Sequence, residues 1–265
     1  MDFFQSVVIA IIEGLTEFLP VSSTAHMRFA NPLIGITPDP FVDMFEIVIQ
    51  LAAILSVVTV YWKKFIDFKH TNFYIKLVIA VIPALIGGYF LKKHIDTALN
   101  NISFIAYVMI GGGIILLFID KLFKKSTINE EEKISNGKAF IIGCFQVLSI
   151  VFPGLSRSAA TIIGGMSQKL TRSVAAEFSF FLAVPTMLAA SAKSFLDVYK
   201  EHHEVLVKNN FTTLGIGAVV AYIVALLSVK FFISYLQKHG FRIFGWYRII
   251  LGIVVLVLLY QGVIK

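Results

Sequence analysis

Residues 102–123 read ISFIAYVMIGGGIILLFIDKLF, a run whose only charged residues, Asp120 and Lys121, stand near its end. A helix needs about 20 mostly apolar residues to cross the hydrocarbon core of a bilayer. This stretch therefore predicts a membrane span. Five further runs reach or approach the same length, at 41–62, 73–91, 174–196, 211–236 and 244–264.

The composition agrees with a membrane protein. The 265 residues are 57% hydrophobic and 15% charged, whereas soluble domains have about 45–50% apolar and about 25% charged residues. A soluble enzyme, a disordered protein and a fibrous repeat are thereby excluded. The single cysteine excludes a disulfide framework and a cysteine-based metal site. We interpret the net charge of +7 as basic loops on one side of the membrane, and we expect no nucleic-acid partner.

Two other apolar stretches are interrupted. Residues 3–19 contain two glutamates and end at Pro20, and residues 139–152 end at Pro153. Each is followed by a Ser/Thr-rich turn and a second short apolar piece, at 27–36 and 159–166. Such backbone at membrane depth is tolerated where protein or a wet cavity surrounds it. The predicted fold is all-α: a polytopic integral membrane protein of six transmembrane helices plus two re-entrant helical hairpins.

Loop charges orient the chain. If 41–62 runs from outside to inside, the inner loops hold 15 of the 23 Lys and Arg residues, Lys69 and Arg248 among them, and the outer side holds 7, Lys265 among them. Arg157 remains, inside an interrupted stretch. The positive-inside rule favours this orientation.

In that orientation the first three spans and the last three run in opposite senses, and a broken hairpin precedes each trio. This predicts an inverted-topology repeat within a single membrane domain, 1–265. The expected halves are about 1–123 and 138–265, joined by a linker at 124–137. At an offset of 133, Glu13 falls on Gln146, Pro20 on Pro153 and Ser23 on Ser156.

The first hairpin carries two acidic residues on one helix face, because Glu13 and Glu17 lie four apart. Carboxylates in an apolar segment are costly and should face protein or water. Two roles suit such a pair. One is binding a hard divalent cation through oxygen ligands, and the other is proton transfer.

Pro20 ends this helix, so that Ser22 or Ser23 can cap the next one and leave free backbone N–H groups for an anion. Ser23 and His26, three residues apart, share a helix face. We therefore expect His26 to take a proton from the Ser23 hydroxyl or from water.

The second hairpin supplies Ser156, Arg157 and Ser158 directly after a Pro-Gly turn. Ser156 can cap the helix that follows, which places Arg157 at its N-terminus. A guanidinium among free amides and hydroxyls is a phosphate clamp. A cation is badly placed against the helix dipole there unless an anion lies between them.

Structural alternatives stand beside these hypotheses. Arg157 could be a counter-ion for Glu13 or Glu17, and the hydroxyl residues could be helix caps only. Glu46 and Glu177 are interpreted as packing or hydrogen-bonding residues, and Gln50 is ambiguous. The glycines at 111–113 indicate close helix packing, since no Lys-Ser/Thr follows them.

The stretches EGLTEFLPVSSTAH at 13–26 and PGLSRS at 153–158 resemble the two signature motifs of the bacterial undecaprenyl-diphosphate phosphatases, also known as bacitracin-resistance phosphatases. FEIVIQL at 45–51 and EFSFFLAVP at 177–185 resemble this family too, so the likeness spans nearly the whole chain. Ala25 and Ala159 stand where the family has, or often has, Gly. Neither change removes a reactive group.

The resemblance implies an enzyme that removes the terminal phosphate of undecaprenyl diphosphate in the bilayer, giving the monophosphate lipid carrier of cell-wall synthesis and conferring bacitracin resistance. Its site would open to the outer face of the cytoplasmic membrane, among membrane lipids, with Mg²⁺ or Ca²⁺ as cofactor. In the leading hypothesis Ser23 attacks the phosphorus with His26 as base, or His26 activates a water. Glu13 and Glu17 bind the metal or shuttle protons. The expected phosphate ligands are Arg157, Thr24, Ser22, Ser156 and Ser158.

A second hypothesis is a polyprenyl-phosphate flippase or other alternating-access transporter that uses the same midplane site. A carrier needs the arginine and the glutamates but no nucleophile. The sequence leaves the oligomeric state open, a homodimer included.

Overall fold

The computed structural model describes residues 1–66 and 71–264, and within these ranges the regular elements are helices. Lys69 and Lys265, both counted in the charge comparison, lie outside the described residues. Six helices are long and apolar enough to cross a membrane, which confirms the predicted fold class. They are α3 (Pro40–Val60), α5 (Thr71–Phe90), α7 (Ile102–Leu122), α10 (Arg172–Glu201), α11 (Lys208–His239) and α12 (Arg242–Tyr260).

Each interrupted stretch forms two helices joined by a turn. The first pair is α1 (Phe3–Thr16) and α2 (Ser23–Leu33), and the second is α8 (Asn136–Val151) and α9 (Arg157–Ser167). Entry of these pairs into the bilayer without crossing it stays a prediction. Four short helices complete the chain: α4 (Trp62–Ile66), α6 (Lys92–Leu99), η1 (Glu131–Lys133) and η2 (His203–Val205).

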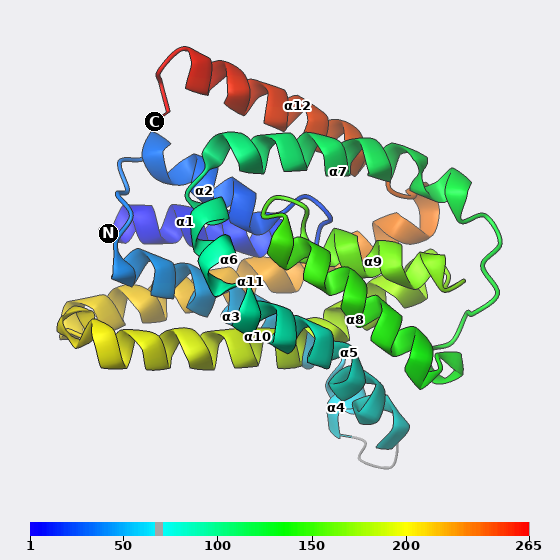
Figure 1. Cartoon of the computed structure of the whole chain (residues 1–265). Helices are drawn as coiled ribbons and strands as arrows, with labels where there is room; N and C mark the ends of the chain where they lie inside the picture. Colours follow the sequence, from blue (N-terminus) through cyan, green and yellow to red (C-terminus); the bar gives the residue numbers. More distant parts are fainter. Residues whose placement is uncertain (67–70, 265) are drawn as a thin grey trace.

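Helices of the first part of the chain pack mainly against helices of the second part. Helix α1 lies along α11 and α8 lies along α5, while α10 packs on α3 and α12 runs beside α7 (Figure 1). The first helix of each part thus packs on the second span of the other part. The inverted repeat itself stays a prediction. The boundaries 1–123 and 138–265 stay predictions.

Glycines allow these exchanged helices to approach closely. A Cβ atom on Gly14 of α1 would lie 2.8 Å from the Ala221 carbonyl oxygen of α11. A Cβ on Gly143 of α8 would overlap the Ala80 carbonyl oxygen of α5. Small residues at membrane helix interfaces let backbones pack this way.

The linker at 124–137 packs against the helices through hydrogen bonds and an ion pair. Thr171 N–H donates to the Ile128 carbonyl (2.9 Å), and Lys64 pairs with the Glu131 carboxylate (2.5 Å). Lys76 of α5, which is buried, donates to the Glu131 carbonyl at 3.1 Å. These contacts fix the connection between the two parts at one end of the bundle.

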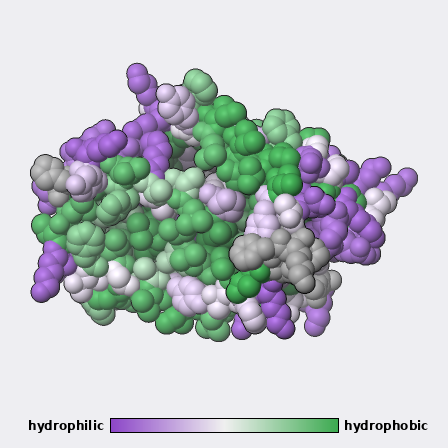
Figure 2. Space-filling view, turned by 90° about the horizontal axis from the view of Figure 1, so that it is seen from below, coloured by the Kyte–Doolittle hydropathy of each residue, from purple (hydrophilic) through white to green (hydrophobic). Residues whose placement is uncertain are grey.

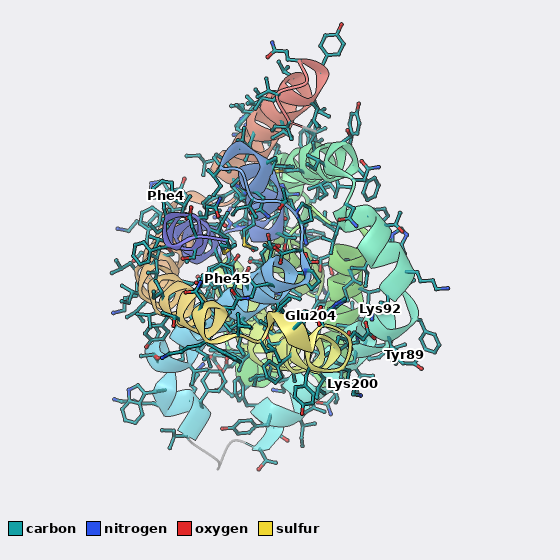
Figure 3. All side chains as sticks on the ribbon, turned by 90° about the vertical axis from the view of Figure 1, so that its left-hand side faces the viewer. Phe4, Phe45, Tyr89, Lys92, Lys200 and Glu204 are labelled. Atoms are coloured by element: carbon teal, nitrogen blue, oxygen red, sulfur yellow. The ribbon has the colours of Figure 1, made fainter. Side chains whose placement is uncertain are left out.

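Apolar side chains cover much of the middle of the molecule's surface, while hydrophilic residues gather mainly toward its two ends (Figure 2). At the end seen in Figure 3, Phe4 lies at the periphery and is 67% exposed, whereas Phe45 is fully buried inside the bundle. Inside, Phe18 packs edge-on against Phe180 of α10, with ring centroids 5.1 Å apart. This contact anchors the turn after α1 to the core.

Candidate functional site

The turn between α1 and α2 meets the turn between α8 and α9 at a cavity of about 70 Å³. Spans α3 and α10 contribute one side chain each. The cavity is lined by Glu17, Ser22, Ser23, Thr24, Gln50, Ser156, Arg157, Ser158 and Met187. Seven of the nine predicted site residues are therefore brought together, and Glu13 and His26 lie outside this lining.

Two serines shape the turns in the same way. Ser22 caps α2 by accepting from Ala25 N–H, and Ser156 caps α9 by accepting from Ala159 N–H. Both adopt left-handed backbone angles, with φ of 71° and 75°. Non-glycine residues held there carry local strain, which clusters at functional sites. The structural equivalent of Ser156 is thus Ser22, not Ser23 as the offset of 133 predicted, because the cap lies two residues after Pro20 but three residues after Pro153.

Glu17 joins the two hairpins. Its Oε2 accepts a hydrogen bond from Ser23 Oγ at 2.5 Å, and its Oε1 accepts one from Arg157 Nη2 at 2.9 Å. Arg157 Nη1 also donates to the Ser179 carbonyl of α10 at 3.1 Å. The counter-ion alternative is thus realised in this geometry, but it leaves the buried Nε of Arg157 without a partner among the described residues.

Glu13 is fully buried, and neither of its carboxylate oxygens has a hydrogen-bond partner in the described ranges. It lies close enough to Glu17 to interact electrostatically. Two such carboxylates suit Mg²⁺ or Ca²⁺, since Mg²⁺ in particular is held by one or two carboxylates together with substrate phosphates. No cluster of three or more His, Cys, Asp or Glu residues that could hold a metal occurs in the described part of the chain. The residues therefore fit a metal ion that is completed by the substrate.

His26 contacts partners other than the Ser23 hydroxyl. Its Nδ1 lies 2.7 Å from the Ser22 carbonyl oxygen, and its Nε2 lies 2.7 Å from the Tyr247 hydroxyl of α12. Since both ring nitrogens are engaged and Ser23 bonds to Glu17, the expected Ser23–His26 pair is not formed. Ser23 and His26 do lie three residues apart on α2, but the hydrogen-bond partner of the Ser23 hydroxyl is Glu17 in the preceding turn.

Ser158 lines the cavity and also connects the second hairpin to the first by a hydrogen bond. Its hydroxyl donates to the Phe18 carbonyl at 3.0 Å. Thr161, one turn further along α9, bonds to the Ser179 hydroxyl at 2.6 Å. The predicted phosphate ligand Ser158 therefore lines the cavity and also fixes its wall.

Arg248 of α12 is a residue that sequence reasoning misplaced. The charge comparison counted it in an inner loop, but it is fully buried. It donates to four carbonyl oxygens, those of Met109, Pro20, Leu155 and Gly154, at 2.7–3.1 Å. Because Pro20 belongs to the first turn and Leu155 to the second, Arg248 holds the two turns side by side.

The glycines of α7 make room for this arginine. A Cβ on Gly112 would overlap the Arg248 guanidinium, and one on Gly113 would lie 2.8 Å from the Gly245 carbonyl oxygen of α12. The interpretation of this triplet as close helix packing is confirmed at these two positions. The glycines were the one sequence signal that could have indicated a large buried neighbour.

Two ambiguous residues of α3 now have defined positions. Gln50 lines the cavity, so it belongs to the site. Glu46 accepts from Asn31 Nδ2 at 2.7 Å and lies 3.5 Å from Arg28. That network supports the hydrogen-bonding interpretation of Glu46.

Residues 6–254 match the family described as bacitracin resistance protein BacA. The chain belongs to this family. Within the BacA family, a relative from Flavobacterium psychrophilum is 50% identical over 258 residues, covering 97% of this chain and 96% of the relative. One from Porphyromonas gingivalis is 46% identical over 279 residues, covering 99% of each. One from Campylobacter jejuni is 43% identical over 267 residues, covering 100% of this chain and 97% of the relative. All three are named undecaprenyl-diphosphatase.

Proposed function

We propose that this chain is a membrane phosphatase that removes the terminal phosphate of undecaprenyl diphosphate and so supports bacitracin resistance. The named activity of its BacA-family relatives supports this hydrolase assignment. Those relatives give no support to the flippase alternative.

One observation carries the proposal. Glu17 accepts hydrogen bonds from a serine and an arginine at once, at the meeting of two hairpins. The buried Arg157 Nε is left with nothing to donate to among the described residues. Phosphoryl transfer uses a nucleophile, a base beside it and a cation that neutralises phosphate charge. Ser23, Glu17 and Arg157 can fill these three roles.

The reaction follows from these contacts. Ser23 Oγ forms a bond to the terminal phosphorus while its proton passes to Glu17 Oε2. The bond from that phosphorus to the bridging oxygen breaks, and the lipid monophosphate leaves with the electron pair. Water then bonds to the phosphorus of the phosphoserine, the bond from phosphorus to Ser23 Oγ breaks, and inorganic phosphate leaves with both hydrogens of the water. Ser23 Oγ takes its proton back from Glu17, which restores both residues. Arg157 neutralises charge on the phosphoryl oxygens, since this chemistry gains mostly from positioning and neutralisation.

The remaining polar residues orient the diphosphate. Ser22, Thr24 and Ser156 line the cavity and can donate hydroxyl hydrogens to phosphate oxygens. A direct attack by water, activated by His26, is the competing route. Trapping phosphorylated Ser23 during turnover distinguishes the two, because direct attack produces no phosphoserine.

Glu13 and Glu17 would hold Mg²⁺ or Ca²⁺. Such an ion, when bound, supplies further neutralisation of phosphate charge. Glu13 is suited to this because its oxygens are buried and unpartnered in the described structure.

The prenyl chain must lie outside the cavity, because about 70 Å³ admits a small anionic group and no long hydrocarbon. Apolar side chains exposed on the span helices offer that chain a surface within the bilayer. We place the protein in the cytoplasmic membrane with the site opening outward. A homodimer stays a prediction.

The test is phosphate release from undecaprenyl diphosphate by the purified protein in detergent. Arg157→Ala and Glu17→Ala should each abolish nearly all turnover. Near-normal turnover by both variants would contradict the assignment.

A further inference from the structure

A second cavity, of about 410 Å³, lies away from the two turns, where α7 ends, α10 begins and α11 ends. Its polar lining comprises Asp120, Lys124, Ser126, Thr171, Arg172 and Ser173. The proposed reaction uses none of these residues. Its volume falls in the range of about 300–1,000 Å³ typical of small-ligand sites.

The cations of this cavity are arranged for an anion. Arg172 Nε donates to Asp120 Oδ1 at 2.7 Å, and Asp120 Oδ2 accepts from Phe241 N–H at 3.1 Å. Both oxygens of the one lining carboxylate are thus occupied. Within the described ranges Arg172 donates only from Nε, so its Nη groups remain available. Lys124 adds a second positive charge, and it forms no ion pair within the part of the chain that the structure describes.

The rest of the lining suits a lipid phosphate rather than a free ion. Ser126 and Ser173 supply hydroxyl donors beside the cations, and Phe123, Met166 and Leu236 supply apolar surface. A guanidinium binds phosphate oxygens through its fork of N–H groups. Apolar side chains next to that group would contact the glycerol and the first carbons of acyl chains.

The position agrees with a headgroup site. The cavity lies at the Lys/Arg-rich end of the spans, which the positive-inside rule assigns to the cytoplasm. Lys121 and Lys125 flank the lining residues in sequence. Basic pockets between membrane helices on that side bind anionic headgroups.

We propose that this cavity binds the phosphodiester headgroup of an anionic phospholipid from the inner leaflet, with Arg172 and Lys124 on the phosphate. The site is separate from the phosphatase centre and does not depend on the proposed activity.

The chain offers a matched pair of variants. Lys124→Gln removes a cation that lines the cavity, whereas Lys125→Gln removes the neighbouring exposed cation that does not line it. Neither breaks an ion pair in the described structure, unlike Arg172→Gln, which would strand Asp120. Ser173→Ala is a second mild variant within the cavity.

The experiment titrates the full-length protein in neutral detergent with short-chain phosphatidylglycerol, phosphatidylcholine or inorganic phosphate, and follows the midpoint of thermal unfolding. Phosphatidylglycerol alone should raise the midpoint. Lys124→Gln should weaken its apparent affinity about fivefold, the effect of one basic residue near an anionic lipid, while Lys125→Gln leaves it unchanged. Ser173→Ala should weaken it by a smaller factor.

Three results would overturn the proposal. Equal stabilisation by phosphatidylcholine would show that the headgroup charge is not recognised. Equal stabilisation by inorganic phosphate would show a free-anion site. Equal weakening by Lys125→Gln would show diffuse attraction to a basic surface, with no role for the cavity.

Discussion

At the scale of single residues, Arg157 both connects two parts of the protein and keeps a donor available for the substrate. It bonds to Glu17 and to the Ser179 carbonyl with its Nη atoms and leaves Nε buried and unused among the described residues. Only a planar guanidinium can hold both partners and still present a donor to a third group.

Arg157→Lys should therefore lower the rate of phosphate release by roughly 10²-fold, although it keeps the positive charge, because a lysine cannot replace the fork of donors. Steady-state phosphate release measures this. A loss of less than threefold would mean that charge alone suffices at this position.

Glu17, and not His26, is placed to take the proton of Ser23. Ser23 donates to Glu17, and both nitrogens of His26 are engaged elsewhere. Glu17→Gln should lower turnover by about 10³-fold, since an amide cannot take the proton and general bases contribute about 10²–10⁴. His26→Gln should cost less than about tenfold, as in the loss of a positioning contact. Equal losses in the two variants would restore His26 as the base.

At the scale of elements, α12 holds both turns through Arg248. Four carbonyl oxygens depend on this one side chain. A buried carbonyl left without a donor costs about 1–3 kcal/mol.

Arg248→Met should lower the free energy of unfolding by roughly 3 kcal/mol or more and reduce phosphate release as the turns separate. The measurement is thermal unfolding in detergent. Arg242→Met is the matched control, because Arg242 lies exposed in the first turn of the same helix. If the two variants unfold at the same temperature, Arg248 does not hold the turns.

Elements were more predictable than their contacts. The six spans follow from apolar run length, and the turns follow from Pro20 and Pro153, because both signals are local. The partner of Ser23, Glu17, is only six residues away, but their contact depends on the backbone of the turn, with Ser22 at positive φ, which residue spacing does not reveal. The burial of Arg248 depends on glycines of α7, more than a hundred residues away. Sequence reasoning therefore named most of the residues that line the cavity and missed the hydrogen bonds between them.

At the scale of the whole molecule, both hairpins must reach one site from opposite parts of the chain. Helix α1 packs on α11 and α8 on α5, and this exchange brings the two turns together (Figure 1). The predicted orientation places the α7–α8 linker inside and the α5–α7 connection outside.

Labelling of single cysteines tests that orientation. In a Cys144→Ser background, Asn100→Cys should react with a membrane-impermeant maleimide in intact cells, and Asn129→Cys should react only after lysis. Both positions are exposed. The reverse pattern would invert the topology and place the Lys/Arg-rich end outside.

The central claim is that the two hairpins form one hydrolytic site with Ser23 as nucleophile. Its most direct test is phosphate release from undecaprenyl diphosphate by purified Ser23→Ala protein. Ser149→Ala is the control, since among the described residues Ser149 bonds only to the Gln146 carbonyl of its own helix and does not line the cavity. The expected result is a loss of at least about 10³-fold for Ser23→Ala, in line with removal of a covalent nucleophile, and normal turnover for the control. Turnover by Ser23→Ala within tenfold of the unmodified protein would contradict the account.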